Sequence, residues 1–219
     1  MLRIRAILFD LIGTTVLEKD PTVINACFEA AFSQHGFVVQ RSQIQEVRGL
    51  DKKEAIDRIL ADADPPAAVK AQILESFKRN VEGSLDNFVE HPAFPEIVHE
   101  LHRRKIPIGI ASGLPHDVFQ PLMKKLQWHN HSLAYTNVYE RCKQGRPHPE
   151  MIFTMCSYLN IDPQDVLKVG DTLVDIQEGK NAGAYTAAVL AGTQPRAMLL
   201  NARPDFIFES LQDVIHVLA

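Results

Sequence analysis

Four short runs of apolar residues stand out along the chain, each bounded by polar or turn-forming residues. They cover residues 4–9, 106–111, 166–169 and 185–190. Short continuous runs of this kind are typical of strands that are buried on both faces of a sheet. Helix-like sequence follows each run, and weaker strand patterns occur at residues 132–138 and 205–208. Strands that alternate with helices predict an α/β fold, a parallel sheet covered by helices on both faces.

The segment between the first two runs breaks this alternation. Its apolar residues lie at helical spacing, and no convincing strand interrupts them. The predicted helices are residues 21–35, 52–63 and 66–85. We therefore predict an α/β core formed by residues 1–17 and 91–219, with a helical cap inserted after the first strand at residues 18–90.

Composition and charge narrow the classes of function. Hydrophobic residues make up 46% of the chain and charged residues 23%, the balance of a soluble globular protein. The net charge is -4 and basic residues are scattered, so no basic patch is expected for nucleic acid or anionic membranes. No stretch approaches the roughly 20 apolar residues of a membrane helix, and the three cysteines show no paired or metal-type spacing. These features predict a cytoplasmic protein that acts on a small molecule.

Residues that follow the predicted strands are candidates for chemistry, because ligands of open parallel sheets bind at the carboxyl ends of the strands. Asp10 ends the first strand, and Thr14 lies in the Gly-Thr-Thr turn after it. Ser112 and Gly113 follow the second strand. Hydroxyl groups and main-chain amides in such turns can surround an anion. The turn that contains Thr14 could therefore surround an anionic substrate, and Ser112 and Gly113 are the corresponding candidates after the second strand.

Two further aspartates favour a metal site. Asp171 follows the third strand, and Asp175 lies four residues later, near the same face of the next helix. Magnesium prefers oxygen ligands and commonly takes one or two carboxylates together with substrate oxygens. We therefore expect Asp10, Asp171 and Asp175 to hold Mg2+. The alternative is that the aspartates only cap helices and interact with the helix dipole.

Four segments in order resemble the motifs of the haloacid dehalogenase superfamily of hydrolases. Residues 9–16, Phe-Asp-Leu-Ile-Gly-Thr-Thr-Val, are similar to the first motif, and Ser112 after Ile-Gly-Ile-Ala is similar to the second. Arg146 in Gly-Arg-Pro-His-Pro corresponds to the third motif, and residues 169–175, Val-Gly-Asp-Thr-Leu-Val-Asp, correspond to the fourth. The resemblance covers nearly the whole chain. It implies a doubly wound, Rossmann-like core with an inserted cap.

The resemblance also implies roles for these residues. Asp10 would be the nucleophile, and Ser112 would bind an oxygen of the transferred group. Arg146 would neutralise the charge of nucleophile and substrate, with Arg replacing the more usual Lys. Asp10 and Asp171 would bind Mg2+, with the main-chain carbonyl of Ile12 as a further ligand.

Ile12 departs from the pattern of the superfamily's phosphatases. These place a second Asp two residues after the nucleophile to protonate the leaving alkoxide and to activate water, and isoleucine can do neither. Two branches lack this Asp, the haloacid dehalogenases and the phosphonoacetaldehyde hydrolases. Residues 145–147, 168–172 and 178–183 are similar to the phosphonoacetaldehyde hydrolases, whereas dehalogenases carry a serine-rich fourth motif.

Lys52 is the candidate for the second chemical role in this branch. Residues 48–52, Arg-Gly-Leu-Asp-Lys, are similar to the segment that bears the Schiff-base lysine. Cleavage of a carbon–phosphorus bond expels a carbanion, and an iminium formed by lysine and a carbonyl group accepts its electrons. Desolvation under a closed cap and adjacent cations would lower the pKa of Lys52. Ala55 and Leu114 stand where this branch has His and Tyr, which leaves the substrate open.

The sequence thus predicts a magnesium-dependent hydrolase that cleaves the carbon–phosphorus bond of a small phosphonate such as phosphonoacetaldehyde. A phosphatase or a haloacid dehalogenase remains an alternative, and so does a non-catalytic phosphate-binding homologue that lost turnover together with the second Asp. The expected partner is a small phosphonate or phosphorylated molecule, with no nucleic acid and no membrane. The protein is expected to be a monomer or a homodimer.

Overall fold

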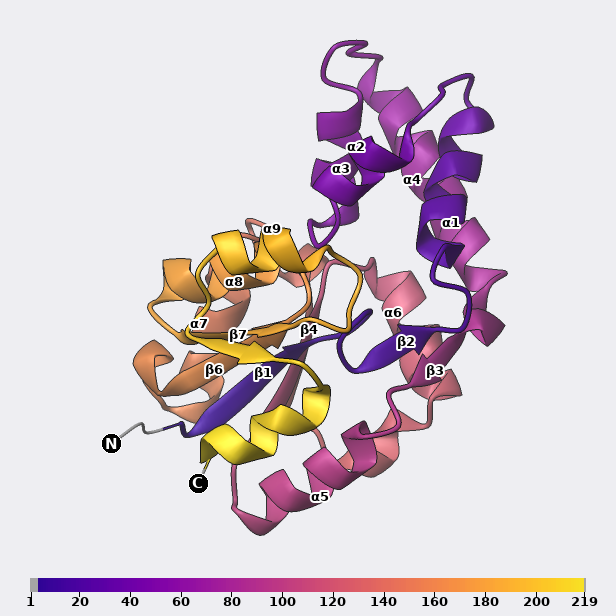
Figure 1. The fold of residues 1–219 in the computed structure, drawn as a ribbon. Coiled ribbons are helices and arrows are strands. Elements are labelled where there is room, and N and C mark those ends of the chain that lie inside the picture. Colours follow the sequence, from indigo (N-terminus) through magenta and orange to yellow (C-terminus); the bar gives the residue numbers. More distant parts are fainter. Residues whose placement is uncertain (1–3, 219) are drawn as a thin grey trace.

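A six-stranded parallel sheet forms the centre of the protein (Figure 1). The computed structural model describes residues 4–218. The strands are β1 (Ala6–Asp10), β4 (Ile108–Ser112), β5 (Tyr135–Val138), β6 (Val166–Gly170), β7 (Tyr185–Val189) and β8 (Phe206–Phe208), and they pair in the order β5-β4-β1-β6-β7-β8. This is the order of a doubly wound sheet, so the predicted α/β fold is confirmed. All six strand patterns of the sequence correspond to strands of this sheet.

Helices cover both faces of the sheet, because strand side chains alternate between two apolar layers. In β1, Ile7 and Phe9 pack into the layer under α5 (Phe94–Arg103) and α6 (His116–Lys125). Ala6 and Leu8 point to the opposite layer, under α7 (Glu150–Leu159). The remaining core helices are α8 (Leu173–Ala182) and α9 (Arg196–Asn201). Burial on both faces explains why these strands are continuous apolar runs in the sequence.

Four helices between β2 (Val16–Glu18) and β3 (Phe88–Glu90) form a separate group beside the carboxyl ends of the strands of the large sheet (Figure 1). They are α1 (Val23–Ser33), α2 (Arg41–Glu46), α3 (Lys52–Ile59) and α4 (Ala67–Glu82). The antiparallel strands β2 and β3 connect this group with the core. Helices α1, α3 and α4 correspond to the three predicted ones. The division into a core and a cap at residues 18–90 stays a prediction, and its boundaries fall at these two strands.

Short 3₁₀ turns complete the chain. They are η1 (Leu85–Asn87), η2 (Trp128–His131), η3 (Tyr139–Arg141), η4 (Pro163–Asp165) and η5 (Leu211–Leu218). None of the helices in residues 4–218 combines the length and the apolar character needed to cross a membrane.

Candidate active site

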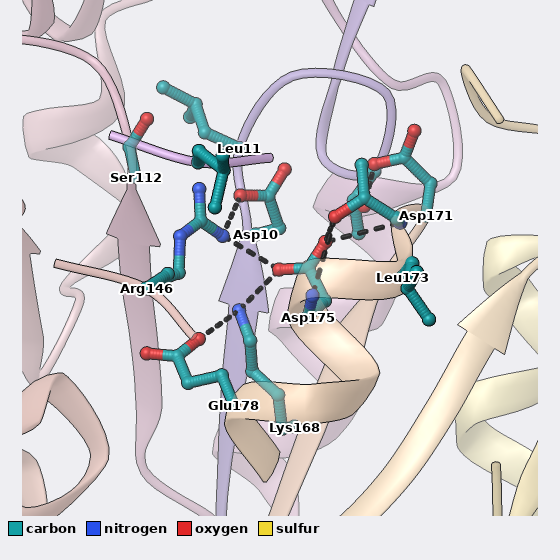
Figure 2. A network of polar contacts seen from close by, with 12 residues as sticks. Asp10, Leu11, Ser112, Arg146, Lys168, Asp171, Leu173, Asp175 and Glu178 are labelled. Atoms are coloured by element: carbon teal, nitrogen blue, oxygen red, sulfur yellow. Dashed lines mark hydrogen bonds and ion pairs between the residues drawn. The ribbon is translucent and has the colours of Figure 1, made fainter. Parts of the chain in front are cut away.

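The carboxyl ends of neighbouring strands bring the predicted acidic residues together (Figure 2). Strand β1 pairs with β4 on one side and β6 on the other, so Asp10, Ser112 and Asp171 lie at one edge of the sheet. Carboxylate oxygens of Asp10, Asp171 and Asp175 lie within 4.8 Å of one another, and all three residues are buried. The cluster occupies the switch point of the doubly wound sheet, where ligands of such folds bind.

Arg146 joins two of these carboxylates. Its Nη1 atom donates to Oδ1 of Asp10 at 2.6 Å and to Oδ1 of Asp175 at 2.7 Å. Burial raises the pKa of Asp10, and the charge of Asp175 adds to this effect, whereas Arg146 and Lys168 oppose it. The ionised form that a nucleophile requires therefore depends on the cations beside it.

Asp171 is held by two threonine residues. Its Oδ2 atom accepts hydrogen bonds from the main-chain N–H of Thr193, at 2.6 Å, and from the Thr193 hydroxyl, and its Oδ1 atom accepts one from Thr14 Oγ1 at 3.2 Å. Burial, followed by the charges of Asp10 and Asp175, raises the pKa of Asp171 to about 7. Gly13, with φ +93°, permits this contact, because a Cβ atom there would lie 2.3 Å from Asp171 Oδ2. The buried Thr14 hydroxyl, predicted to bind substrate, donates to Asp171 in this structure.

The protein engages both carboxylate oxygens of Asp175. Its Oδ1 atom accepts from Arg146 Nη1 and lies 2.9 Å from Nζ of Lys168. Its Oδ2 atom accepts from the main-chain N–H of Thr172 at 3.2 Å and from the Thr172 hydroxyl. Burial would raise the pKa of Asp175, but Lys168 and Arg146 hold it below its usual range. The protein thus contacts both oxygens that Asp175 could offer to a metal, and the role of Asp175 as a ligand stays a prediction.

The cluster fits a divalent cation by its charge. Four buried carboxyl groups, Asp10, Asp171, Asp175 and Glu178, surround two buried cations, Arg146 and Lys168. The ionised cluster therefore carries two negative charges in excess, and such a site binds a cation strongly.

The oxygen donors left over by the protein are of the kind that magnesium prefers. The main-chain carbonyl of Ile12 accepts none of the hydrogen bonds found in the described part of the chain. Asp10 and Asp171 add carboxylate oxygens that lie within 4.8 Å of each other. These three residues would hold the ion, with further positions open to water and substrate.

A small cavity opens beside Asp10. Six of the predicted residues line it: Asp10, Ile12, Lys52, Ser112, Gly113 and Arg146. Its volume is about 40 Å³, which on a scale of about 10–15 Å³ per water molecule corresponds to about three waters. The cavity therefore suits a phosphoryl-sized group in the present closed arrangement.

Lys52 reaches this cavity from the start of helix α3. Asp51 caps helix α3 by accepting from Glu54 N–H at 2.8 Å, so Lys52 is the first helical residue. Its Nζ atom donates to the carbonyl oxygen of Leu50 at 3.2 Å and lies 5.8 Å from the ring centre of Phe28. Burial, followed by the charges of Arg146 and Arg48, lowers the pKa of Lys52 to about 8. No ion pair in residues 4–218 includes Lys52, so its amine is available inside the cavity.

The cation beside Lys52 is itself anchored. Arg48 donates from Nη1 to Asn25 Oδ1 at 3.1 Å and from Nη2 to the buried carboxylate of Glu18. Asn25 and Glu18 belong to α1 and β2, so Arg48 links the two ends of the connection between cap and core. Sequence reasoning identified Arg48 but missed Glu18, because nothing in the sequence links positions so far apart.

Three more residues of the site were missed. Thr193 binds Asp171 from the loop after β7, and no pattern in the sequence predicts that contact. Lys168 and Glu178 are fully buried and lie 3.3 Å apart at the nearest atoms. A charged residue inside the apolar run 166–169 was the one available signal for Lys168.

Comparison with known proteins finds similarity to hydrolases over nearly the whole chain. A model of the haloacid dehalogenase-like hydrolase family matches residues 7–189. The chain is 30% identical to pyrophosphatase PpaX of Oceanobacillus iheyensis over 98% of this chain and 96% of that protein. It is 28% identical to phosphonoacetaldehyde hydrolase of Latilactobacillus sakei, over 87% and 77%. The structure of a phosphonoacetaldehyde hydrolase-like protein from Oleispira antarctica superimposes with a TM-score of 0.83 over 99% and 94% of the chains, at 21% identity.

Proposed function

Because the chain belongs to the haloacid dehalogenase-like hydrolases, we propose that it cleaves the carbon–phosphorus bond of a small phosphonate such as phosphonoacetaldehyde. Asp10 is the nucleophile, and Lys52 forms a Schiff base with the substrate. The observation that carries this proposal is that Asp10 and Lys52, which makes no ion pair with residues 4–218, line the same small cavity. Ile12 stands where a phosphatase needs a second carboxyl group.

The proposed reaction uses both side chains in turn. The Lys52 amine condenses with the aldehyde carbon, water leaves, and a protonated imine forms. Asp10 attacks phosphorus, the carbon–phosphorus bond breaks, and its electron pair moves into the iminium to give an enamine. Water cleaves the aspartyl phosphate, releasing phosphate and restoring Asp10. Protonation of the enamine carbon and hydrolysis of the resulting imine release acetaldehyde and free Lys52.

The low pKa of Lys52 supports the first step. An amine with a pKa of about 8 is unprotonated in roughly a tenth of molecules at pH 7, far more often than an ordinary lysine. The later cleavage of the carbon–phosphorus bond needs no acid for an alkoxide, because its leaving group is an enamine. The apolar side chain of Ile12 is compatible with that chemistry.

The remaining residues position the transferred group. Ser112 Oγ accepts from the main-chain N–H of Leu114 at 3.1 Å, which leaves its hydroxyl hydrogen for a phosphoryl oxygen. Arg146 Nη2 lies next to Gly113, on the cavity side of the guanidinium. Hydrolases of this family generally use Mg2+, and we propose that Asp10, Asp171 and the Ile12 carbonyl hold it. The ion would neutralise the charge on the phosphoryl oxygens and the nucleophile.

Hydrolysis of a phosphate ester or anhydride is the second candidate. The 30% identity to a pyrophosphatase favours it, as does the presence of an ammonium group in the cavity that Asp10 lines. In that reaction Lys52 would bind an anionic oxygen and would form no covalent bond.

Borohydride trapping separates the two candidates. The protein is incubated with Mg2+, phosphonoacetaldehyde and borohydride, the adduct is located by peptide mass spectrometry, and phosphate release is measured in parallel. We expect a reduced adduct on Lys52 and none in Lys52→Arg, which keeps the charge but forms no imine. Lys53→Met, which removes the exposed neighbouring lysine, is the matched control and should behave as wild type. Phosphate release from pyrophosphate without any adduct would refute the Schiff base and support the second candidate.

A further inference from the structure

Lys168 occupies an unusual place for a charged residue. It lies in the middle of strand β6, between β1 and β7, and its side chain has no exposed surface. Its partner Glu178 on α8 is equally buried. Moving two ions out of water costs several kcal/mol for each ion, and well-packed apolar residues of similar volume often give a more stable protein. The pair therefore calls for an explanation other than the stability of the fold.

The pair is the lower end of a line of alternating charges that reaches the nucleophile (Figure 2). Glu178 Oε2 lies 3.3 Å from Lys168 Nζ, which lies 2.9 Å from Asp175 Oδ1. The same oxygen accepts from Arg146 Nη1 at 2.7 Å, and Nη1 also donates to Asp10 at 2.6 Å. Each side chain lies next to one of opposite charge, from Glu178 on α8 to Asp10 at the carboxyl end of β1.

The geometry points to Lys168 and Glu178 as positioning residues for Arg146, an inference that rests on the proposed roles of Asp10 and Arg146. Lys168 pairs with Asp175 Oδ1 as an ion at 2.9 Å and keeps this carboxylate directed at Arg146. Glu178 balances the charge of Lys168, so that Lys168 does not draw Asp175 away from the guanidinium. Nη1 is thereby fixed between two carboxylates, and Nη2 stays on the cavity side beside Gly113.

Without the pair, Asp175 would lose the cation beside Oδ1 while it still lies close to Asp10 and Asp171. The carboxylate would then be free to turn toward a cation bound there, and Arg146 would lose one of the two anchors of Nη1. A guanidinium held by Asp10 alone is free to rotate out of the plane that presents Nη2 to the substrate. The predicted consequence is weaker binding and slower transfer of the phosphoryl group, with the fold unchanged.

The test separates positioning from stability by replacing both members at once. The double variant Lys168→Met/Glu178→Met keeps the length of both side chains and leaves no unpaired ion. Its melting temperature should equal or exceed that of wild type. We expect its kcat for phosphate release, and its affinity for orthovanadate in the presence of Mg2+, to fall by about 10- to 100-fold, the equivalent of one charge-assisted hydrogen bond. Lys168→Met alone should show the same losses and, unlike the double variant, should melt lower than wild type, because it leaves Glu178 buried without a partner.

Leu199→Ala is the control for stability. Leu199 packs in a small apolar cluster with Ile176 and Ala188, away from the ion pairs. This variant should melt lower than wild type and keep the kcat and the vanadate affinity of wild type at 25 °C.

A direct measurement makes the result independent of turnover. In protein labelled with 15N and 13C arginine, the two Nη signals of Arg146 should be resolved in wild type, because two carboxylates hold Nη1 and slow its rotation. They should merge in the double variant. A double variant that keeps separate signals and wild-type vanadate affinity would overturn the positioning role. If wild type neither releases phosphate nor binds vanadate while the signals still merge in the double variant, the proposed reaction fails and the positioning of Arg146 stands. If the double variant does not fold, Glu178→Gln is measured instead. We expect it to lose 3- to 10-fold in vanadate affinity, about the effect of weakening a single ion pair. No loss of affinity would overturn the positioning role.

Discussion

Replacing Asp171 by asparagine is expected to stabilise the metal-free protein at pH 8. Asp171 is fully buried beside two other carboxylates, and its pKa is raised from 3.8 to about 7. Asparagine keeps the local hydrogen bonds. Its Oδ1 atom can accept from Thr193, and its amide can donate to the Thr14 hydroxyl, which then turns from donor to acceptor. The substitution therefore removes a charge and little else.

The size of the effect follows from the shift in pKa. The folded protein binds the Asp171 proton more tightly than the unfolded chain, so stability falls as pH rises from about 4 to about 7. A shift of about three units corresponds to about 4 kcal/mol, which is fully lost above pH 7. For a chain of this length, about 4 kcal/mol corresponds to a change of about 8–16 °C in melting temperature.

Thermal unfolding measured in EDTA between pH 4 and pH 8 tests this expectation. The difference between Asp171→Asn and wild type should be small at pH 4, grow with pH and level off above pH 7. Adding Mg2+ at pH 8 should stabilise wild type, by about 2.7 kcal/mol at a concentration 100 times the dissociation constant. The variant should gain much less, because it has lost a ligand.

Asp62→Asn controls for the loss of a carboxylate in general, because Asp62 is exposed in the cap; it should follow the wild-type curve. The reasoning would be refuted if Asp171→Asn melted at or below wild type at pH 8 in EDTA. That result would mean that the three aspartates do not oppose one another as their burial and separation imply.

Three other substitutions address the cavity. Ile12→Asp should raise the hydrolysis of para-nitrophenyl phosphate by about 10²- to 10⁴-fold, the usual range of general acid–base catalysis, and an unchanged rate would contradict the placement of Ile12 beside the leaving group. Arg48→Met removes a cation that lowers the pKa of Lys52. The rate of phosphonate cleavage should rise with pH as Lys52 loses its proton near pH 8, and in the variant this rise should occur at higher pH. A pH profile that does not move, or moves to lower pH, would count against this reasoning. Gly113→Ala would place a Cβ atom 2.5 Å from the carbonyl oxygen of Leu50 and should raise KM about tenfold or more. In the control Gly83→Ala the nearest atom would be 3.4 Å away, and KM should not change. Equal KM values for the two variants would show that Leu50 does not lie against Gly113 in the working enzyme.

The sheet could be predicted from the sequence because burial on both faces leaves a strong local record. Strands β1 and β6 are apolar over almost their whole length and end at Asp10 and next to Asp171. Connections β2 and β3 leave almost no record, because each has three residues and pairs with a partner about 70 residues away. Helix α2 was missed because it is also short and buries only Ile44 of its six residues, which leaves no apolar pattern of helical spacing.

The sequence predicted those site residues that end a strand or follow it directly. It did not predict residues whose contacts come from distant loops. Asp10, Ser112 and Asp171 belong to the first group. Thr193 belongs to the second, because its contact depends on how the loop after β7 returns across Asp171. The ion pairs of Asp175 could not be foreseen either, since a carboxylate at that spacing fits a metal ligand as well as a partner for Arg146.

Strand β1 lies at the centre of the sheet although it is made first. Its neighbour β6 begins at Val166, 160 residues after β1 begins at Ala6. At a synthesis rate of about 5–20 residues per second, that interval takes about 8–32 s. During it the growing chain carries β1 with both edges unpaired until β4 is made and with one edge unpaired afterwards. Unpaired strand edges favour aggregation. The same arrangement that gathers the acidic residues at one point thus delays completion of the sheet until most of the chain has left the ribosome.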